Sequence, residues 1–483
     1  MSNCEFTFLF HDYETFGKDP SLDRPAQFAS LRTDKNFNVI EEPILLYCQT
    51  ASDYLPKPEA VIITGITPQI ANKNGVKEAT FAKHIHNLFT KPKTCIIGYN
   101  NVYFDDEITR NVFYRNFYDP YSWSWKNGNS RWDLLNVMRT CYALRPDGII
   151  WPKNNDGFPS FKLEKLTKAN GLVHKQKHNA MSDVYATQAL AKLVKEKKPK
   201  LFNFLFTHRN KLKIKNLINI SQMNPLIHIS SIFGASRSNV GYIVPLAWHP
   251  YNCNALIVAD LSGNITSLLT LKINELAKLL YTPCDELGEH VSLPIKIIYI
   301  NKCPILMPVN ILRLEDIERL GINQLLCLKN LVLLREHIEI QKKIKSVFIN
   351  KSKLFIKSND VDTQLYQGFF SNADRNKMNI LLKTIPKNLA TVALDLKFDD
   401  KRINKLLFRY RARNFPDTLD YNERQDWNQH CRSILNNEYI NIFLSELKKL
   451  VNENKKDAKK IILLRELYLH FKELITNNNQ LNF

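Results

Sequence analysis

The sequence predicts an α/β domain at the N-terminus, followed by a region of short strands and then by a helical region. Up to about residue 196, apolar runs such as residues 6–10 alternate with segments of helical periodicity. Short β-rich runs follow at residues 238–244, 255–261 and 295–300. Helical periodicity then continues to about residue 475. We therefore expect two regions that contain sheets and one all-α region.

Two breaks divide the chain. The first, at residues 195–200, is a charged stretch with a proline directly after a predicted helix. At the second, residues 350–360, the periodicity lapses, and residues 476–480 are expected to form a frayed tail. The predicted domains are residues 1–196, 197–352 and 353–483. The alternation of strands and helices in the first domain predicts an α/β fold.

The first candidate site residues end the first predicted strand. Residues 6–10 are aromatic and aliphatic, and Gly17 marks the turn that follows. Side chains two residues apart project from the same face of a strand, so Asp12 and Glu14 can share one metal site. By itself, an Asp-x-Glu pair is more often a polar strand end.

The second candidate follows a predicted strand at residues 95–97. Asp105 lies near the start of a helix predicted through residues 108–113, where a carboxylate either complements the helix dipole or binds a metal. Asp106 and Glu107 are adjacent candidates. Spacing does not choose among the three acids.

The third candidate pair surrounds the start of another helix. Residues 183–194 have helical periodicity and high helix propensity, with Asp183 in the first turns and His178 in the loop ahead. A loop histidine with an ordinary pKa of about 6.5 suits a general base that works near neutral pH. Alone, such a pair is usually a surface feature.

Together, the carboxylates indicate a metal-dependent phosphodiesterase. An all-carboxylate set of Asp12, Glu14, Asp105 and Asp183 suits Mg²⁺, with Mn²⁺ as a substitute, rather than zinc. Two divalent cations would offset the repulsion between these acids and a phosphate diester. The imidazole of His178 then need not bind a metal and can deprotonate the attacking water.

The order and spacing of these residues resemble the DEDD exonucleases, in the subclass that uses histidine as the base. That subclass places histidine five positions before the last aspartate, as His178 and Asp183 stand here. The tyrosine subclass requires tyrosine four positions before it, where this chain has Asn179. Asp133 is a rival carboxylate, but in such enzymes an aspartate at this point is more often structural.

Longer motifs resemble the bacterial exodeoxyribonuclease I family over essentially the whole chain. They are residues 11–17, 22–28, 62–68, 98–101, 113–121 and 406–416. The resemblance implies that the first domain is an α/β exonuclease domain of the ribonuclease H-like type. It also implies that the middle region is an SH3-like β-barrel with helical additions and that the C-terminal domain is all-α. It also implies Mg²⁺-dependent, processive degradation of single-stranded DNA from the 3′ end to 5′-mononucleotides, in DNA repair and recombination.

The same resemblance implies which side chains contact the DNA strand. They are Glu14, Arg110, Tyr121, Trp125, Arg139, Lys162 and Lys211. Tyr121 and Trp125 offer rings for base stacking, whereas Trp123 and Trp132 are expected to pack in the core. Lys162 stands where the family usually shows arginine. Lysine lacks the planar bidentate grip on phosphate, so we expect weaker substrate binding with the chemistry intact.

Both the composition and the family resemblance indicate which molecules the protein binds. The chain has 67 lysines and arginines against 47 aspartates and glutamates, a formal charge of +20 that attracts polyanions. A codon bias towards lysine explains this excess equally well. The resemblance implies that a monomer docks on the acidic, hydrophobic tail of the single-stranded DNA-binding protein. Arg145, Arg313 and Arg335 are predicted to form a basic site, here called the basic seat, that binds this tail.

The nine cysteines are scattered, without a CxxC pair. This argues against a disulfide framework or a zinc finger and favours the reducing cytoplasm. The sequence contains no apolar run of the length that a membrane span requires, so no membrane association is expected.

Two alternatives remain open. One is an exoribonuclease of the same superfamily, because metal-binding residues do not read the sugar. The additional domains and the long motifs weigh against it. The other is a nucleic-acid-binding scaffold whose nuclease activity has lapsed, and the presence of all five site residues weighs against that hypothesis.

Overall fold

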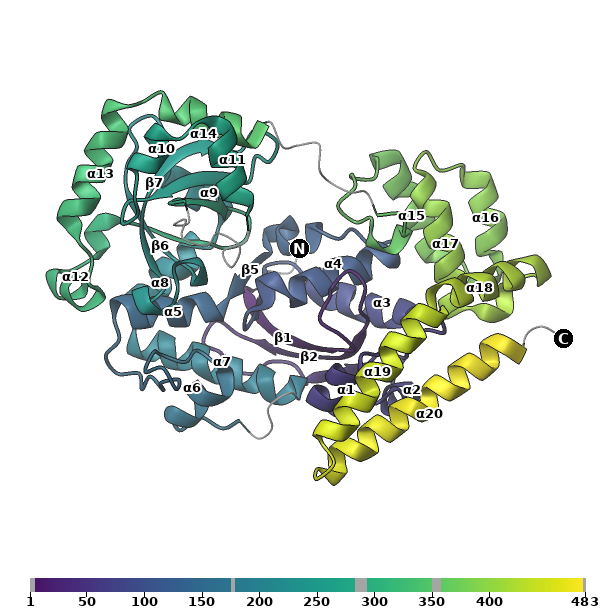
Figure 1. The fold of residues 1–483 in the computed structure, drawn as a ribbon. Coiled ribbons are helices and arrows are strands. Elements are labelled where there is room, and N and C mark those ends of the chain that lie inside the picture. Colours follow the sequence, from purple (N-terminus) through teal and green to yellow (C-terminus); the bar gives the residue numbers. More distant parts are fainter. Residues whose placement is uncertain (1–4, 175–178, 283–292, 350–357, 481–483) are drawn as a thin grey trace. The chain divides into compact units, whose positions relative to one another are not determined.

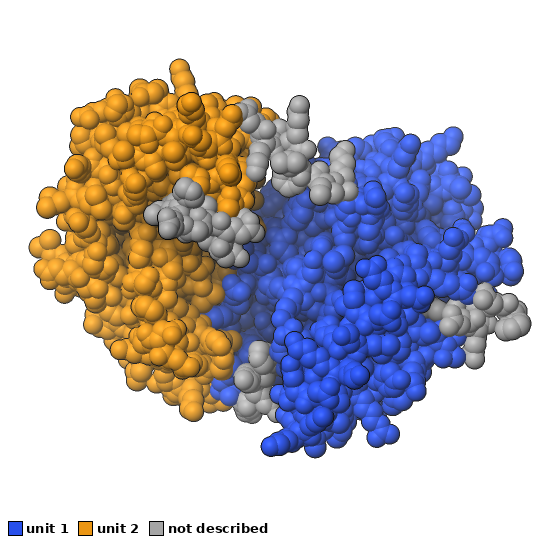
Figure 2. Space-filling view, viewed as in Figure 1, with its two compact units in different colours: residues 1–131, 174–188, 357–483 blue, residues 132–173, 189–356 orange. Residues whose placement is uncertain are grey.

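The computed structural model of the chain describes residues 5–174, 179–282, 293–349 and 358–480, which form two compact units (Figure 2). Unit 1 comprises Met1–Arg131, His174–Gln188 and Lys357–Phe483, and unit 2 comprises Trp132–Val173 and Ala189–Ile356. Each sheet has five strands. In these described ranges, no helix combines the length and the apolar character needed to cross a bilayer.

The sheet of unit 1 has the strand order β3-β2-β1-β4-β5, and Figure 1 labels β1, β2 and β5 of it. Its strands are β1 (Thr7–Thr15), β2 (Pro25–Thr33), β3 (Ile44–Tyr47), β4 (Thr94–Gly98) and β5 (Ser130–Asp133), the last of which runs into unit 2. β1 is central, antiparallel to β2 and parallel to β4. Phe8, Leu9 and Phe10 are buried, so the strand predicted from the aromatic run at residues 6–10 is confirmed.

Helices pack against this sheet. They are α1 (Pro58–Thr64), α2 (Pro68–Asn74), α3 (Glu78–Phe89), α4 (Asp105–Arg115) and α7 (Ala180–Lys197), which continues into unit 2. Leu9 and Phe28 of the sheet share a core with Phe81 of α3 and Val112 of α4. The helices predicted through residues 108–113 and 183–194 are therefore confirmed as α4 and α7.

The C-terminal part of unit 1 is helical, as predicted. It contains α15 (Asn372–Lys383), α16 (Leu389–Leu396), α17 (Lys401–Asn414), α18 (Tyr421–Ile434), α19 (Asn437–Glu453) and α20 (Ala458–Gln480). α19 and α20 pack on α1 and α2, and α15 and α17 pack around Tyr114 and Phe117. The predicted frayed tail at residues 476–480 is wrong, because α20 continues to Gln480. Asparagine is a mediocre helix former but no breaker, and an existing helix is easily extended.

Unit 2 is built on an antiparallel sheet with the order β10-β6-β7-β8-β9. Its strands are β6 (Leu226–Ile229), β7 (Val240–Trp248), β8 (Ala255–Asp260), β9 (Ile295–Tyr299) and β10 (Ile305–Pro308). The strands predicted at residues 238–244, 255–261 and 295–300 correspond to β7, β8 and β9. Ile243, Leu256 and Ile298 meet in the core of this sheet.

Nine helices lie wholly within the described residues of unit 2. They are α5 (Leu134–Leu144), α6 (Leu163–Ala169), α8 (Pro199–His208), α9 (Lys211–Asn216), α10 (Thr266–Thr270), α11 (Ile273–Tyr281), α12 (Leu314–Leu320), α13 (Gln324–Glu336) and α14 (Ile340–Ile349). The first predicted break falls between α7 and α8, at Lys198. Most of the second lies outside the described residues.

A buried ionic network joins the N-terminal and C-terminal parts of unit 1. Arg413 Nη2 donates to Asp53 Oδ2 (2.6 Å) and also pairs with Asp362, and Arg24 Nη2 donates to Asp362 Oδ2 (3.0 Å). All four side chains are buried. Burial opposes ionisation of Asp53 and Asp362, yet the charge of Arg413 holds the pKa of both carboxyls below the ordinary value. The charges therefore depend on one another.

We predict that Asp362→Asn lowers the free energy of unfolding by about 3–5 kcal/mol, because it leaves buried arginines without their full counter-charge. Urea titration measures the change. The matched control is Glu59→Gln, which breaks an exposed pair with Lys18 Nζ (2.8 Å) and is expected to change stability by less than about 1 kcal/mol. Equal effects of the two substitutions would contradict the role of the network.

Acid titration tests the same network. Because the pKa of Asp53 and of Asp362 is lowered in the folded protein, their ionised forms stabilise it above the ordinary carboxyl pKa of about 4. This contribution is lost as the pH falls from about 4 towards the lowered value. The parent is therefore expected to lose stability more steeply below about pH 4 than Asp362→Asn.

Candidate active site

Asp12 and Glu14 lie at the end of the central strand. Alternation along β1 places both side chains on one face, with Asp12 opposite Ala29 and Glu14 opposite Gln27 of β2. Pairing between β1 and β4 ends at Phe10. The last residues of β1 therefore extend beyond their pairing with β4, where carboxylates can gather from neighbouring elements.

Asp183 joins this pair from the first turn of α7. Asp12, Glu14 and Asp183 each offer one carboxylate oxygen, and these oxygens all lie within 4.8 Å of one another. Glu14 is buried, whereas the other two are partly exposed. The structure thus brings together three of the four predicted ligands in a site with an open side.

Asp105 lies against the same end of β1. Its Oδ1 accepts a hydrogen bond from the backbone N–H of Tyr13 (3.0 Å), the residue between Asp12 and Glu14. Asp105 is not one of the three residues within 4.8 Å. Its negative charge nevertheless contributes to the raised pKa of Asp12, so it belongs to the same electrostatic environment.

The two acids beside Asp105 bind basic side chains. Asp106, which is fully buried, pairs with Arg131 and accepts from Asn101 Nδ2 (3.1 Å). Glu107 Oε1 accepts from Arg110 Nη1 (2.7 Å). Spacing could not separate the three acids. Their contacts differ, because Asp105 accepts a hydrogen bond from the strand that carries Asp12 and Glu14, and its choice as the ligand stays a prediction.

Burial and the repulsion between neighbouring carboxylates raise the pKa of Asp12 and Glu14. Burial, followed by the charges of neighbouring acids, raises the pKa of Asp12 well above the ordinary value. Burial and the charge of Asp183 raise the pKa of Glu14 to about 8. Full ionisation of this cluster requires a counter-charge. Hard oxygen donors at this spacing fit a divalent cation such as Mg²⁺ or Mn²⁺.

Two histidines precede Asp183. His178, the predicted base, lies outside the described residues. His174 Nε2 lies 2.6 Å from Asp183 Oδ1, a contact that the sequence analysis missed. No spacing rule singled out His174, because only the folded loop brings it to the carboxylate.

Three of the predicted DNA contacts of unit 1, Arg110, Tyr121 and Trp125, lie on α4 and the loop that follows it. The Arg110 guanidinium lies 5.6 Å from the centre of the Tyr121 ring. Trp125 follows in the same loop and is 66% exposed, so its ring is available for stacking. Trp123 and Trp132 are buried, as expected.

The remaining predicted residues lie in unit 2. Arg139 Nη1 donates to Asn136 Oδ1 (2.9 Å), and Lys162 and Lys211 are exposed next to α6 and at the start of α9. Asp133 accepts from the backbone N–H of Leu135 (2.9 Å) and caps α5, so its predicted structural role is confirmed.

The predicted basic seat is also in unit 2. Arg145 Nη1 and Arg313 Nε both donate to Asp316 Oδ2, at 2.9 and 3.0 Å. Arg335 binds the backbone oxygen of Gln222 instead (3.0 Å). Two of the three predicted arginines therefore share one carboxylate.

Three family models match the chain: Exonuclease over residues 9–191, Exonuclease I SH3-like domain over 209–350 and Exonuclease I C-terminal domain over 359–474. Exodeoxyribonuclease I of Escherichia coli is 57% identical over 97% of this chain and 98% of its own length. The chain belongs to the exodeoxyribonuclease I family. The Haemophilus influenzae member is 50% identical, over 96% of this chain and 98% of its own length. The predicted enzyme class is confirmed.

Solved structures of family members support the fold. E. coli exonuclease I in complex with an oligonucleotide has a TM-score of 0.95 at 57% identity, covering 97% of this chain and all of that chain. A zinc-bound form of the E. coli enzyme with single-stranded DNA also has a TM-score of 0.95, at 56% identity, with 98% and 100% coverage. The predicted exonuclease, SH3-like and helical C-terminal domains of the exodeoxyribonuclease I family are confirmed.

We predict that Asp105→Asn and Asp106→Asn separate metal binding from folding. Asp105→Asn is expected to weaken Mn²⁺ binding by at least about tenfold with little change in stability, because Asp105 lies against the acidic cluster. Asp106→Asn is expected to lower stability instead, because it leaves Arg131 buried without its counter-charge. Isothermal titration with Mn²⁺ and urea unfolding measure the two quantities. The assignment fails if Asp106→Asn weakens metal binding while Asp105→Asn does not.

Proposed function

We propose that this protein degrades single-stranded DNA from the 3′ end and releases 5′-mononucleotides. The proposal rests mainly on the carboxylate cluster of Asp12, Glu14 and Asp183, whose oxygens lie within 4.8 Å of one another. Support comes from the family, because the E. coli relative has been crystallised with single-stranded DNA. The proposed pathway is DNA repair and recombination.

Two Mg²⁺ ions, for which Mn²⁺ substitutes, are the proposed cofactors. Asp12, Glu14, Asp105 and Asp183 are the proposed ligands that would hold them. Bound divalent cations would neutralise charge on the scissile phosphate and on the leaving oxygen.

The residues of the chain have separate proposed tasks. His178 takes a proton from the attacking water on an imidazole nitrogen, as its position five residues before Asp183 suggests. Tyr121 and Trp125 stack on bases, and Arg110 and Glu14 contact the strand near the cluster. Arg139, Lys162 and Lys211 contribute further contacts, and their positive charges favour the phosphate groups of the strand.

The proposed organisation is that of a cytoplasmic monomer with domains at residues 1–196, 197–352 and 353–483. The exonuclease domain cuts, and the other two help to keep the strand bound between cuts. A strand that stays bound would be digested processively.

The test is digestion of 5′-labelled single strands of DNA and RNA of the same sequence, with and without Mg²⁺. We expect Mg²⁺-dependent loss of DNA, with full-length strand and final products predominating if digestion is processive. Asp183→Ala is expected to lower the rate by roughly 1,000-fold or more, and the control Glu59→Ala to leave it unchanged. Equal rates for Asp183→Ala and the parent, or preferential loss of RNA, would refute the proposal.

We further propose that the acidic tail of the single-stranded DNA-binding protein docks on Arg145, Arg313 and Arg335. Charge-assisted hydrogen bonds from arginine to carboxylates favour such a tail. Replacing all three arginines by alanine is expected to weaken binding of a tail peptide by at least about tenfold, as measured by fluorescence anisotropy. The control replaces the exposed Lys211, Lys213 and Lys215 of α9. Unchanged affinity of the arginine variant would remove this seat.

A further inference from the structure

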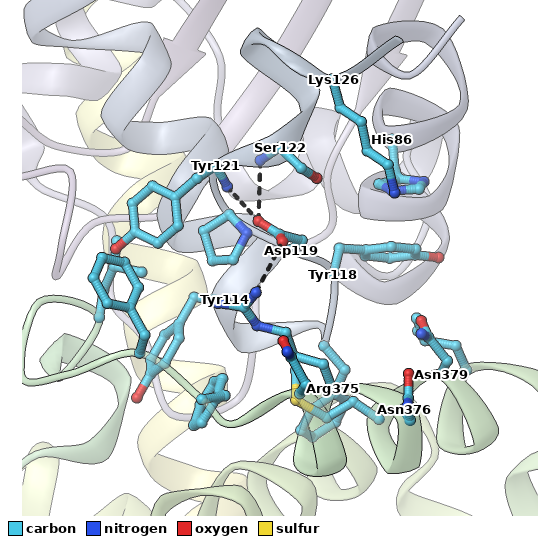
Figure 3. Close-up of a pocket in the computed structure, with 18 of the residues that line it drawn as sticks. His86, Tyr114, Tyr118, Asp119, Tyr121, Ser122, Lys126, Arg375, Asn376 and Asn379 are labelled. Atoms are coloured by element: carbon cyan, nitrogen blue, oxygen red, sulfur yellow. Dashed lines mark hydrogen bonds and ion pairs between the residues drawn. The ribbon is translucent and has the colours of Figure 1, made fainter. Parts of the chain in front are cut away.

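Unit 1 contains a cavity of about 650 Å³ between the loop after α4 and helix α15 (Figure 3). Tyr121 and Trp125, two of the proposed DNA contacts, line it together with Tyr118. A strand that stacks on Tyr121 and Trp125 therefore passes its mouth. The size of the cavity falls in the range of sites that hold small organic ligands.

One wall of the cavity is aromatic and firmly held. The ring of Tyr118 stacks on His86 with centroids 4.3 Å apart. Asp119 accepts hydrogen bonds from the backbone N–H groups of Tyr121 (2.8 Å) and Ser122 (3.0 Å) and lies 3.9 Å from Arg375. These contacts fix the conformation of residues 118–125, here called the aromatic loop, before any ligand binds. A preformed site loses less entropy on binding.

The opposite wall is a polar face of α15. Asn372, Arg375, Asn376 and Asn379 line the cavity and are spaced so that they share one side of the helix. Figure 3 shows Tyr118 between His86 on one side and Asn376 and Asn379 on the other. Both asparagines are exposed. A carboxamide offers a donor and an acceptor side by side, as the edge of a nucleobase does.

The charge of the cavity is modest. Lys126 and Arg375 contribute positive charges and Asp119 a negative one. Burial lowers the pKa of His86 to about 4, so its imidazole is neutral at pH 7. Rings and neutral amides, rather than a cluster of cations, form the surface opposite Tyr118, which favours a base over a phosphate group.

We propose that this cavity binds one nucleobase of the single strand, turned out of the strand, with its face on Tyr118 and its edge at Asn376 and Asn379. The proposal rests on the proposed function, because it requires the strand at Tyr121 and Trp125. None of Asp12, Glu14, Asp105 and Asp183 lines the cavity, so the bound base acts on strand retention and not on the cut itself. Its sugar and phosphate stay in the strand.

An abasic scan tests the proposal. A fluorescent single strand of uniform sequence carries one abasic nucleotide at successive positions from the 3′ end, and anisotropy measures its binding to the full-length protein in the presence of a chelator. We expect one position outside the last two nucleotides at which the abasic site weakens binding by roughly 5- to 150-fold, the range of one stacked base. In the double variant Asn376→Leu, Asn379→Leu, this penalty is expected to fall to less than about a third of its parental value.

The control variant is Asn452→Leu, an exposed asparagine on α19 at which the positional penalty is expected to persist. Thermal unfolding of each variant verifies that the fold is intact. The base-binding proposal would be overturned if an abasic nucleotide weakened binding to the parent protein equally at all positions. It would also be overturned if the double variant retained the full loss of affinity at the sensitive position. If the parent degrades the strand in either case, the proposed function survives. A parent that neither binds nor degrades single-stranded DNA would overturn both.

Discussion

Repulsion among the carboxylates of Asp12, Glu14 and Asp183 is the constraint on which the candidate site depends. Two like charges 4 Å apart repel by about 1 kcal/mol in water, and several times more in a protein environment of lower permittivity. The fold holds these charges together on rigid supports. Two come from the central strand and one from the first turn of α7, while the backbone N–H of Tyr13 holds Asp105 nearby. Burial and this repulsion together raise the pKa of Glu14, and a bound divalent cation would relieve the repulsion.

A second set of charges supports the surface beside the site. Asp362, in the buried network with Arg24 and Arg413, lies just before the segment that carries Tyr366 and Phe369. The Tyr366 hydroxyl donates to Glu107, and the ring of Phe369 lies 5.4 Å from that of Tyr121. Buried ion pairs contribute little net stability, but they are demanding in geometry. Here they hold a C-terminal segment against α4 and the aromatic loop.

Much of the fold could be predicted from local patterns. The aromatic run before Asp12 and the helical periodicity after Asp183 depend on neighbours in the sequence, and both elements are where the patterns place them. The SH3-like character of the middle region came from long motifs, because short alternating strands alone do not define how a sheet closes. The tail at residues 476–480 was mistaken because asparagine-rich composition was taken as a sign of fraying, whereas α20 extends through it. His174 was overlooked because its contact with Asp183, nine positions along the chain, follows no spacing rule.

The sequence by itself determined that Asp12 and Glu14 share a face, because alternation is a property of any extended strand. It also determined that Asp183 lies in the first turns of a helix, and long motifs identified the family. Only the tertiary structure distinguished Asp105 from Asp106 and Glu107, because the bond to Tyr13 joins residues 92 positions apart. Likewise, only folding places α15 opposite Tyr118 to form a cavity. Contacts between distant segments follow from the packing of whole elements, which no local pattern of residues records.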